Sequence, residues 1–292
     1  MHATTKPLSA SSPAPPGKWA SRLLTESETT LGRQELVNEF DAAQFEALGP
    51  WITGFELGGN HYGGQYRADT DSRVLRFIRT FRKRLAASNR GRDQPLRILE
   101  CGCLEGGHTS VLAQAFPDAE ITAVDVRETS LNKAKFILSA SGITNVRLTK
   151  ENLNEASPAL SQQYDAIFCV GLLYHLRDPA AFLTRAAQAT DFLWLSTIIC
   201  AEPEATTVED DFRGRFFGEA VEHPLSGVNP QSFQPTIGSL ADMLWTAGFN
   251  QILLLEKSMA PDGNGPAVLL KAERNPARNS GTLPNSAGGL PA

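Results

Sequence analysis

Short apolar runs alternate along the chain with segments in which apolar residues recur at helical spacing. Residues 96–102 form an apolar run ending in glycine, which predicts a buried strand, and helix-period positions follow over residues 109–115. We expect further strands over 121–125, 146–148, 164–170, 192–196, 251–255 and 267–271, and helices over 131–140, 180–189 and 240–247. Strands that alternate with helices predict an α/β fold with a doubly wound, mostly parallel sheet.

The last predicted helix and the last two strands carry boundary signals. Thr236 is the expected N-cap of the helix, and Gly248 is the expected residue after its end. The turn-rich residues 261–266 then join the two final strands over a short distance. Because parallel neighbours need a long crossover, this short connection predicts that one strand is inserted antiparallel.

The remaining residues divide the chain into regions. We expect a disordered leader over 1–29, an N-terminal cap over 30–90, a sheet domain over 91–273 and a disordered tail over 274–292. A transit peptide is the alternative for the leader, which has no acidic residue before Glu26, but its few arginines favour disorder. The cap holds a helix-like stretch over 36–48. The cap and an insertion over 197–236 are expected to cover one edge of the sheet.

Composition narrows the class of protein. The chain has 292 residues, 41% of them hydrophobic, with 27 Lys and Arg against 32 Asp and Glu, so its formal net charge is −5. This acidic balance argues against tight nucleic-acid binding, and no run of 18 apolar residues lacks a charge, so we expect no membrane span. Four cysteines are too few for a disulfide scaffold and indicate a reduced, cytoplasmic location. The scattered histidines and cysteines predict no metal site.

The strongest chemical signal is the sequence ECGCLEGGHT over residues 100–109, where a strand meets a glycine-rich loop and a helix. Gly102 can adopt backbone angles closed to other residues, and a missing Cβ at Gly106 would let a ligand approach. Asp125 ends the next strand, 23 residues after Gly102, where a carboxylate can accept hydrogen bonds from both hydroxyls of a ribose. Loop and acid together predict a nucleoside-containing cofactor.

Two cofactor classes fit this pattern. A dinucleotide loop has the spacing G-x-G-x-x-G, whereas this loop holds Leu104 and Glu105 between its glycines, and a carboxylate would repel a pyrophosphate. S-adenosylmethionine has no phosphate, and Glu100 could bind its amine directly or through water. The residues therefore favour S-adenosylmethionine over NAD.

At this point the chain resembles the class I S-adenosylmethionine-dependent methyltransferases over residues 96–273, through residues 99–109, 123–126, 164–175, 247–249 and 265–270. The resemblance implies a Rossmann-like sheet of seven strands with the last one antiparallel, and S-adenosyl-L-methionine as cofactor. The residues that it implies for cofactor binding are Glu100, Gly102, Cys103, Gly106, Asp125, Val126, Asn152, Leu153, Cys169 and Val170. The chain departs from the family at Leu104, where a glycine is usual.

Residues 168–179 resemble a narrower group, the tRNA wobble-uridine carboxymethyltransferases, which carry a similar Gly-Leu-Leu-Tyr-His stretch. Only the fold is transferred from this likeness, because the basic residues with which those enzymes hold a carboxylated form of the cofactor cannot be placed in this sequence. His175 is the candidate base toward an acceptor hydroxyl, with packing as the alternative, and Tyr174 is a candidate for lining the same site. His108, at a helix start, is expected to be structural.

The function hypothesis is methyl transfer to a small-molecule acceptor, with oxygen as the expected acceptor atom. A tRNA-modifying enzyme, a non-catalytic cofactor-binding module and an NAD-dependent oxidoreductase are the alternatives. Residues 61–66 could form a flap over the site or a β-hairpin of the cap, and residues 212–217 interleave two arginines with aromatic rings. We expect the latter to pack within the insertion.

Overall fold

The computed structural model describes residues 40–88, 94–258 and 266–275. The expected leader over 1–29 and the residues 276–292 of the expected tail lie outside these ranges. So do residues 36–39 of the stretch predicted as helical and residues 261–265 of the final turn. The predicted boundary between cap and sheet domain near residue 90 also falls in a gap, and it stays a prediction.

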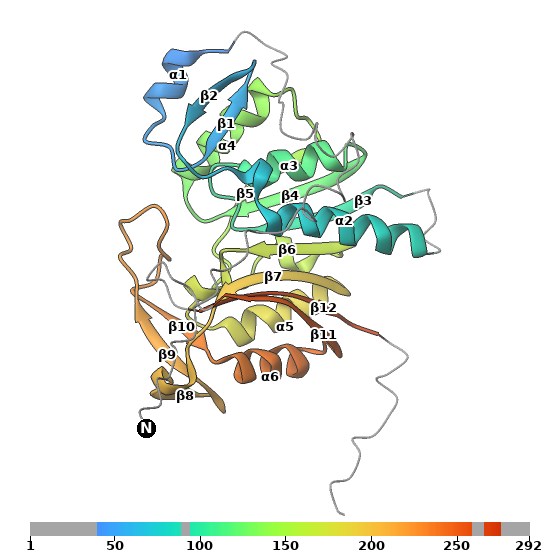
Figure 1. Ribbon diagram of the computed structural model, residues 1–292, viewed down its shortest axis with the longest axis vertical. Helices are drawn as coiled ribbons and strands as arrows, with labels where there is room; N and C mark the ends of the chain where they lie inside the picture. The colour runs from blue at the N-terminus through green and yellow to red at the C-terminus, as the bar shows by residue number, and fades with distance from the viewer. Residues whose placement is uncertain (1–39, 89–93, 259–265, 276–292) are drawn as a thin grey trace, which may run out of the picture.

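A seven-stranded sheet forms the centre of the molecule, in the spatial order β11-β12-β7-β6-β3-β4-β5 (Figure 1). All neighbours pair in parallel except at β12, which is antiparallel to both β7 and β11. The strands are β3 Leu96–Cys101, β4 Ala119–Asp125, β5 Val146–Lys150, β6 Ala166–Val170, β7 Phe192–Ile198, β11 Gln251–Ser258 and β12 Ala267–Glu273. The Rossmann-like fold with its antiparallel last strand is confirmed.

Helices cover both faces of this sheet. One face carries α2 Ser72–Ala87, α3 Gly107–Ala115 and α4 Glu128–Ala140, and the other carries α5 Pro179–Ala189 and α6 Ile237–Ala247. Successive strand residues face opposite layers. Ile98 therefore packs with α2 and α3, whereas Leu99 packs with α5 and α6. As predicted, Thr236 caps α6 by accepting a hydrogen bond from Ser239 N, and Gly248 ends it at a φ of 108°.

Helix α2 had no counterpart among the expected elements. Its buried residues Val74, Phe77, Ile78 and Phe81 lie at helical spacing along one face, and they pack against the sheet beside Phe168. The signal was thus present in the sequence, but the six basic residues between positions 73 and 84 obscured it. Residues of the expected cap therefore contribute directly to the central core.

The other N-terminal elements form a small unit over α4. They are α1 Ala42–Ala47 and the hairpin of β1 Gly54–Leu57 and β2 Asn60–Gly63. Phe45, Phe55 and Leu57 pack against Ile137 of α4. Of the two expectations for residues 61–66, the hairpin of the cap is the one found for residues 61–63.

The insertion after β7 forms a separate three-stranded antiparallel sheet in the order β10-β9-β8. Its strands are β8 Thr207–Glu209, β9 Phe212–Gly218 and β10 Gln231–Pro235. Four 3₁₀ turns complete the described residues: η2 Ala68–Thr70, η3 Ala159–Ser161, η4 Leu173–His175 and η5 Glu202–Glu204. Across the described ranges, no helix combines the length and the apolar character needed to cross a bilayer.

Phe77→Ala should destabilise the protein by about 3–5 kcal/mol, the usual range for emptying a fully buried phenylalanine site. Phe77 is fully buried and its ring lies 5.1 Å from that of Phe168 and 5.9 Å from that of Trp194, so the change opens a cavity between α2 and the sheet. Urea denaturation would measure the loss, with exposed Lys83→Ala on the same helix as the control. Equal stability of the two variants would contradict a core role for α2.

Candidate functional site

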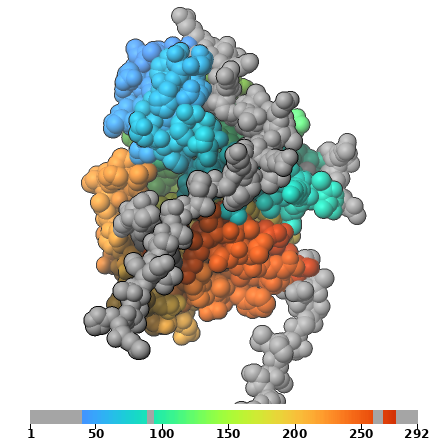
Figure 2. All heavy atoms as spheres, viewed as in Figure 1, coloured from blue at the N-terminus to red at the C-terminus, as the bar shows by residue number. Residues whose placement is uncertain are grey.

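A pocket of about 380 Å³ lies at the carboxyl ends of β3, β4 and β6. Its walls come from the N-terminal segment, the loop after β3, the ends of β4, β5 and β6, and residues 224–228 of the insertion. Figure 2 shows the blue N-terminal residues directly above the orange residues of the insertion, at one side of the molecule. Residues of both the N-terminal segment and the insertion therefore line the pocket at the carboxyl ends of the strands, where ligands of doubly wound folds bind.

The loop after β3 owes its shape to backbone contacts with β4. The amides of Gly102 and Cys103 both donate to Val124 O, at 2.9 and 3.0 Å, and Gly102 has a φ of 79°. Leu104 also has a positive φ, 48°, in a region that favours glycine. Its amide donates to Asp125 Oδ2 at 2.9 Å, and this bond helps to hold the strained residue.

Asp125 lines the pocket with one backbone bond on each carboxylate oxygen. Oδ2 accepts from Leu104 N, and Oδ1 accepts from Arg127 N at 2.9 Å. Burial raises the pKa of Asp125, although the hydrogen bonds from Arg127 and Leu104 oppose the rise. Each oxygen keeps a further lone pair, so the carboxylate is fixed in place and can still accept from a ligand.

Glu100 is buried directly beneath this loop, with 1% of its surface exposed. Among the residues that the structure describes, neither carboxylate oxygen has a hydrogen-bond partner, and the nearby Thr109 hydroxyl lacks one as well. Burial raises the pKa of Glu100 to about 8, and the neighbouring Asp125 adds to the rise. An unsatisfied buried carboxyl group is costly, and a cationic ligand group in this cradle would relieve the cost.

The side chain of Glu105 does not lie where the comparison of NAD with S-adenosylmethionine assumed, because it contacts the N-terminal segment and α4. Its carboxylate accepts from the amides of Ile52 and Thr53, at 2.9 and 2.7 Å, and pairs with Lys133 Nζ at 2.7 Å. The charge is therefore neutralised within the protein. The prediction that Glu105 would repel a pyrophosphate in the loop is wrong, and the argument against NAD from this residue falls.

The structure brings most of the predicted site residues together. Those that line the pocket are Gly102, Cys103, Asp125, Val126, Asn152, Leu153, Val170, Tyr174 and His175. Glu100, Gly106 and Cys169 do not line it. Gly106 has a φ of 81°, and a Cβ there would lie 3.0 Å from Ala134 Cβ, so this glycine permits packing against α4 rather than approach by a ligand. Cys169 is buried in the core with α5 and α6.

His175 forms a pair that the sequence did not suggest. It ends the turn η4, and its Nδ1 lies 3.0 and 3.1 Å from the two carboxylate oxygens of Glu219, which follows β9. The Glu219 side chain is 2% exposed and that of His175 is 17% exposed. The His175 ring lines the pocket next to Tyr174, with ring centroids 4.1 Å apart.

Arg127 fastens the insertion over the pocket. Its Nη2 donates to the carbonyl oxygens of Val221, His223 and Ser226, at 2.7, 3.3 and 3.0 Å. Because Arg127 follows Asp125 by two residues, the end of β4 presents a carboxylate to the pocket and also holds its cover. Residues 219–228 are called the cover loop below.

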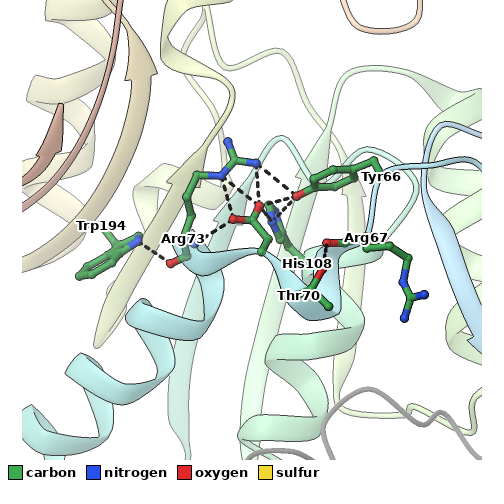
Figure 3. A network of polar contacts seen from close by, with 7 residues as sticks. Tyr66, Arg67, Thr70, Arg73, His108 and Trp194 are labelled. Carbon is green, nitrogen blue, oxygen red and sulfur yellow. Dashed lines mark hydrogen bonds and ion pairs between the residues drawn. The ribbon is translucent and has the colours of Figure 1, made fainter. Parts of the chain in front are cut away.

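The sequence patterns also failed to indicate a polar cluster on the pocket wall that Tyr66, Arg73 and His108 form. Figure 3 shows Tyr66, Arg73 and His108 turned toward one another from the segment before η2, from α2 and from α3. All three contact the carboxylate of Asp71: Tyr66 Oη donates at 2.6 Å, Arg73 Nη2 donates at 2.6 Å, and His108 Nε2 lies 2.9 Å away. The cluster unites residues of two helices with one from the segment before η2, so spacing along the chain could not reveal it.

Burial and hydrogen bonds within this cluster shift the pKa values of its ionisable side chains. Burial alone would raise the pKa of Asp71, but hydrogen bonds from His108 and Arg73 outweigh burial and hold the pKa below its usual range. Burial raises the pKa of Tyr66 and lowers that of His108, the latter against the opposing effect of Asp71. Tyr66, Arg73 and His108 line the pocket, and Arg73 Nη1 has no bonded partner within the described ranges.

Other candidates from the sequence do not form a site. The arginines of residues 212–217 pair with acids of the same insertion, Arg213 with Glu202 and Arg215 with Glu204. The four cysteines are buried and free. In the part of the chain that the structure describes, no cluster of three or more His, Cys, Asp or Glu side chains is arranged to hold a metal ion.

Comparisons with known proteins agree with this geometry. Residues 98–191 match the family described as a methyltransferase domain. An uncharacterized protein of Synechococcus sp. is 40% identical over 93 residues, which are 32% of this chain and 22% of that protein. A ubiquinone biosynthesis O-methyltransferase of Saccharophagus degradans is 33% identical over 92 residues, again 32% of this chain and 38% of that enzyme. The chain thus spans well under half of the length of these relatives.

The likeness to a solved structure covers more of the chain. The N-terminal domain of EvdMO1, solved with SAH bound, is 27% identical with a TM-score of 0.69, over 80% of this chain and 95% of that domain. The same domain, solved in the presence of SAH and D-fucose, has a TM-score of 0.68. Together with the sheet order and the loop after β3, these matches confirm the resemblance found in the sequence. The chain therefore contains a class I S-adenosylmethionine-dependent methyltransferase domain.

Proposed function

We propose that the protein transfers the methyl group of S-adenosyl-L-methionine to a hydroxyl oxygen of a small-molecule acceptor. The observation that carries this proposal is one pocket lined by both Asp125 and His175, with His175 paired to the buried Glu219 behind it. When bound, the cofactor supplies an electrophilic methyl group on a sulfonium. The residues of the pocket then have to bind the cofactor, orient the acceptor and accept its proton.

Several features fit the parts of this cofactor. The free lone pairs of Asp125 suit the two ribose hydroxyls, and Val126, Asn152 and Leu153 line the wall beyond it, where adenine would bind. Glu100 does not line the pocket, so its orphaned carboxyl suits the amine through an intervening water rather than by direct contact. Arg73, at the start of α2, has guanidinium hydrogens left for a carboxylate. With these groups assigned, Val170 and Gly171 at the end of β6 are the lining residues that would lie beside the sulfonium.

Oxygen is the acceptor atom best supported by the side chains present. His175, held through Nδ1, is placed to accept a proton, and a hydroxyl must lose one when it is methylated. Among the relatives are O-methyltransferases of ubiquinone biosynthesis, and a similar domain was solved with D-fucose present. The pocket volume of about 380 Å³ agrees with a cofactor and a small acceptor.

The tRNA alternative gains little support from the surface charges. Of the basic side chains of α2, Arg73 pairs with Asp71, Arg76 with Glu256 and Arg84 with Glu273. These pairs neutralise three of the six basic side chains of the helix. The likeness to tRNA carboxymethyltransferases and the cytoplasmic location both stay predictions.

Asp125→Ala should weaken binding of S-adenosylhomocysteine by roughly 10²-fold, because charge-assisted hydrogen bonds are worth about 1.5–3 kcal/mol each. Isothermal titration calorimetry of the purified protein would measure this loss, with NAD titrated in parallel. The exposed Asp118→Ala serves as the matched control and should bind like the wild type. Binding of NAD alone would overturn the methyltransferase proposal.

Glu100→Gln should change how stability depends on pH in the ligand-free protein. A carboxyl group whose pKa is about 8 in the folded state disfavours folding when it ionises. The wild type should therefore lose free energy of unfolding as pH rises from about 4.3, the unfolded pKa, to about 8. The glutamine variant should lack this part of the decline.

Denaturation with urea at a series of pH values would measure the difference between the two proteins. Addition of S-adenosylhomocysteine should reduce the decline in the wild type, because its ammonium group would face the ionised carboxylate. Parallel pH profiles of wild type and Glu100→Gln would show that Glu100 is not the group responsible.

His175→Ala should keep its affinity for S-adenosylhomocysteine but lose about 10²-fold in kcat, the usual contribution of a general base. Release of S-adenosylhomocysteine would be followed with a panel of sugar alcohols and phenols as acceptors. His61→Ala, which changes an exposed histidine outside the pocket, is the control. Full turnover by His175→Ala would rule out the proposed base.

A further inference from the structure

Glu219 is a buried carboxylate with an unusual set of partners. It accepts hydrogen bonds from His175 Nδ1 at 3.0 Å, from Gly227 N at 2.8 Å and from Ser232 Oγ at 2.8 Å. Within the described ranges no lysine or arginine pairs with it. A buried carboxylate without a fixed positive partner is stable only when it is fully hydrogen-bonded. Its one partner able to become positive is the imidazole of His175.

These contacts fix the orientation of the imidazole. A carboxylate can only accept, so Nδ1 of His175 donates, and in the neutral ring Nε2 then carries the lone pair. Nε2 has no hydrogen-bond partner among the residues that the structure describes, and the ring lines the pocket. The arrangement therefore presents a proton acceptor to the pocket and keeps a negative charge behind it.

From this geometry we propose that Glu219 is the positioning residue of a His175–Glu219 pair that deprotonates an aliphatic hydroxyl acceptor. The inference rests on the function proposed above. As the acceptor oxygen bonds to the methyl carbon, the carbon–sulfur bond breaks and its electron pair stays on sulfur. The hydroxyl proton moves to His175 Nε2, Glu219 stabilises the resulting imidazolium, and the proton later passes to solvent. The products are a methyl ether and S-adenosylhomocysteine.

The acidity of the acceptor is the reason to expect an aliphatic hydroxyl. A phenol such as that of tyrosine ionises near pH ~10, whereas a hydroxyl as weakly acidic as water has a pKa of about 15.7. A phenol therefore forms some of its reactive phenolate without a general base. An alcohol or sugar hydroxyl gains far more from a base with a carboxylate behind it.

Glu219 also connects the base to the cover loop. The hydrogen bond from Gly227 N to Glu219 joins the two ends of the cover loop. Gly227 also packs closely against η4, because a Cβ at this position would lie 2.7 Å from His175 O. Arg127 holds the same loop from the other side of the pocket. The orientation of His175 thus depends on two segments far apart in sequence, η4 and the insertion.

Other ionisable groups near His175 are few. The Tyr174 ring lies beside that of His175 at an interplanar angle of 44°, and burial raises the pKa of Tyr174, with Arg73 opposing the rise and Glu219 adding to it. Arg177, two residues after His175, pairs with Glu209. Glu219 is therefore the group through which a substitution should move the pH dependence of His175.

The test compares Glu219→Gln, which keeps the shape and removes the charge, with the wild type. Turnover would be measured from pH 5 to 9 with D-fucose as the aliphatic probe and catechol as the phenolic probe. We expect kcat to fall by about 10²-fold. KM and the affinity for S-adenosylhomocysteine should not change, and the acid limb of the kcat profile should shift toward lower pH. Ser232→Ala, which removes a different bond to Glu219, should retain the pH profile.

A second measurement needs no acceptor. Nitrogen-15 NMR of histidine-labelled protein with S-adenosylhomocysteine, assigned with His175→Gln, reports which ring nitrogen carries the proton. We expect the Nδ1–H form in the wild type and a mixture of tautomers in Glu219→Gln. The Nε2–H form in the wild type would overturn the positioning role, whether or not either probe reacts.

The remaining outcomes separate the two levels of inference. A raised KM with an unmoved acid limb would mean that Glu219 only holds the cover loop. Faster turnover of catechol than of D-fucose would overturn the assignment of an aliphatic acceptor while leaving methyl transfer intact. If the wild type does not bind S-adenosylhomocysteine, the proposed function itself fails.

Discussion

The buried carboxylate of Glu105 is the contact on which the pocket depends. It joins three parts of the chain, because it lies in the loop after β3, accepts from the amides of Ile52 and Thr53, and pairs with Lys133 of α4. Without it, the N-terminal segment would have no polar attachment to the loop at this point. Ile52 and Thr53, which line the pocket, would then lose their tie to the loop. The carboxylate of Glu105 thus attaches the N-terminal segment and α4 to the glycine-rich loop. These contacts satisfy its charge, which explains why a charged residue is tolerated in this loop.

The sequence predicted the sheet well because each strand and helix carries its own local pattern. The apolar runs before Gly102 and Asp125 needed no partner to be recognised, and the antiparallel last strand followed from a short connection. The loop after β3 and Asp125 were found for the same reason, since the two lie a fixed number of residues apart. Features that depend on the sequence of one segment alone, such as a strand, a helix or a glycine-rich loop, could therefore be predicted.

Contacts between distant segments could not be predicted. Glu219 lies 44 residues after His175, in an insertion without clear periodicity, and only the folded chain brings the two side chains together. The cluster around Asp71 likewise joins residues of the cap to His108. Helix α2 was missed for another reason, because its many arginines masked a regular apolar face. The role of Gly106 was misjudged since the neighbour of its α-carbon, Ala134, belongs to a later helix.

The antiparallel insertion of β12 has a consequence for synthesis on the ribosome. In the described part of the chain, β11 pairs with the sheet only through β12, and β12 in turn lies between β11 and β7. While the chain is emerging, β11 leaves the exit tunnel before any strand exists with which it can pair. Its backbone N–H and C=O groups that pair with β12 would stay unpaired until residues 267–273 follow. The parallel half of the sheet can thus assemble vectorially, whereas the other edge must wait for the last strand to be translated.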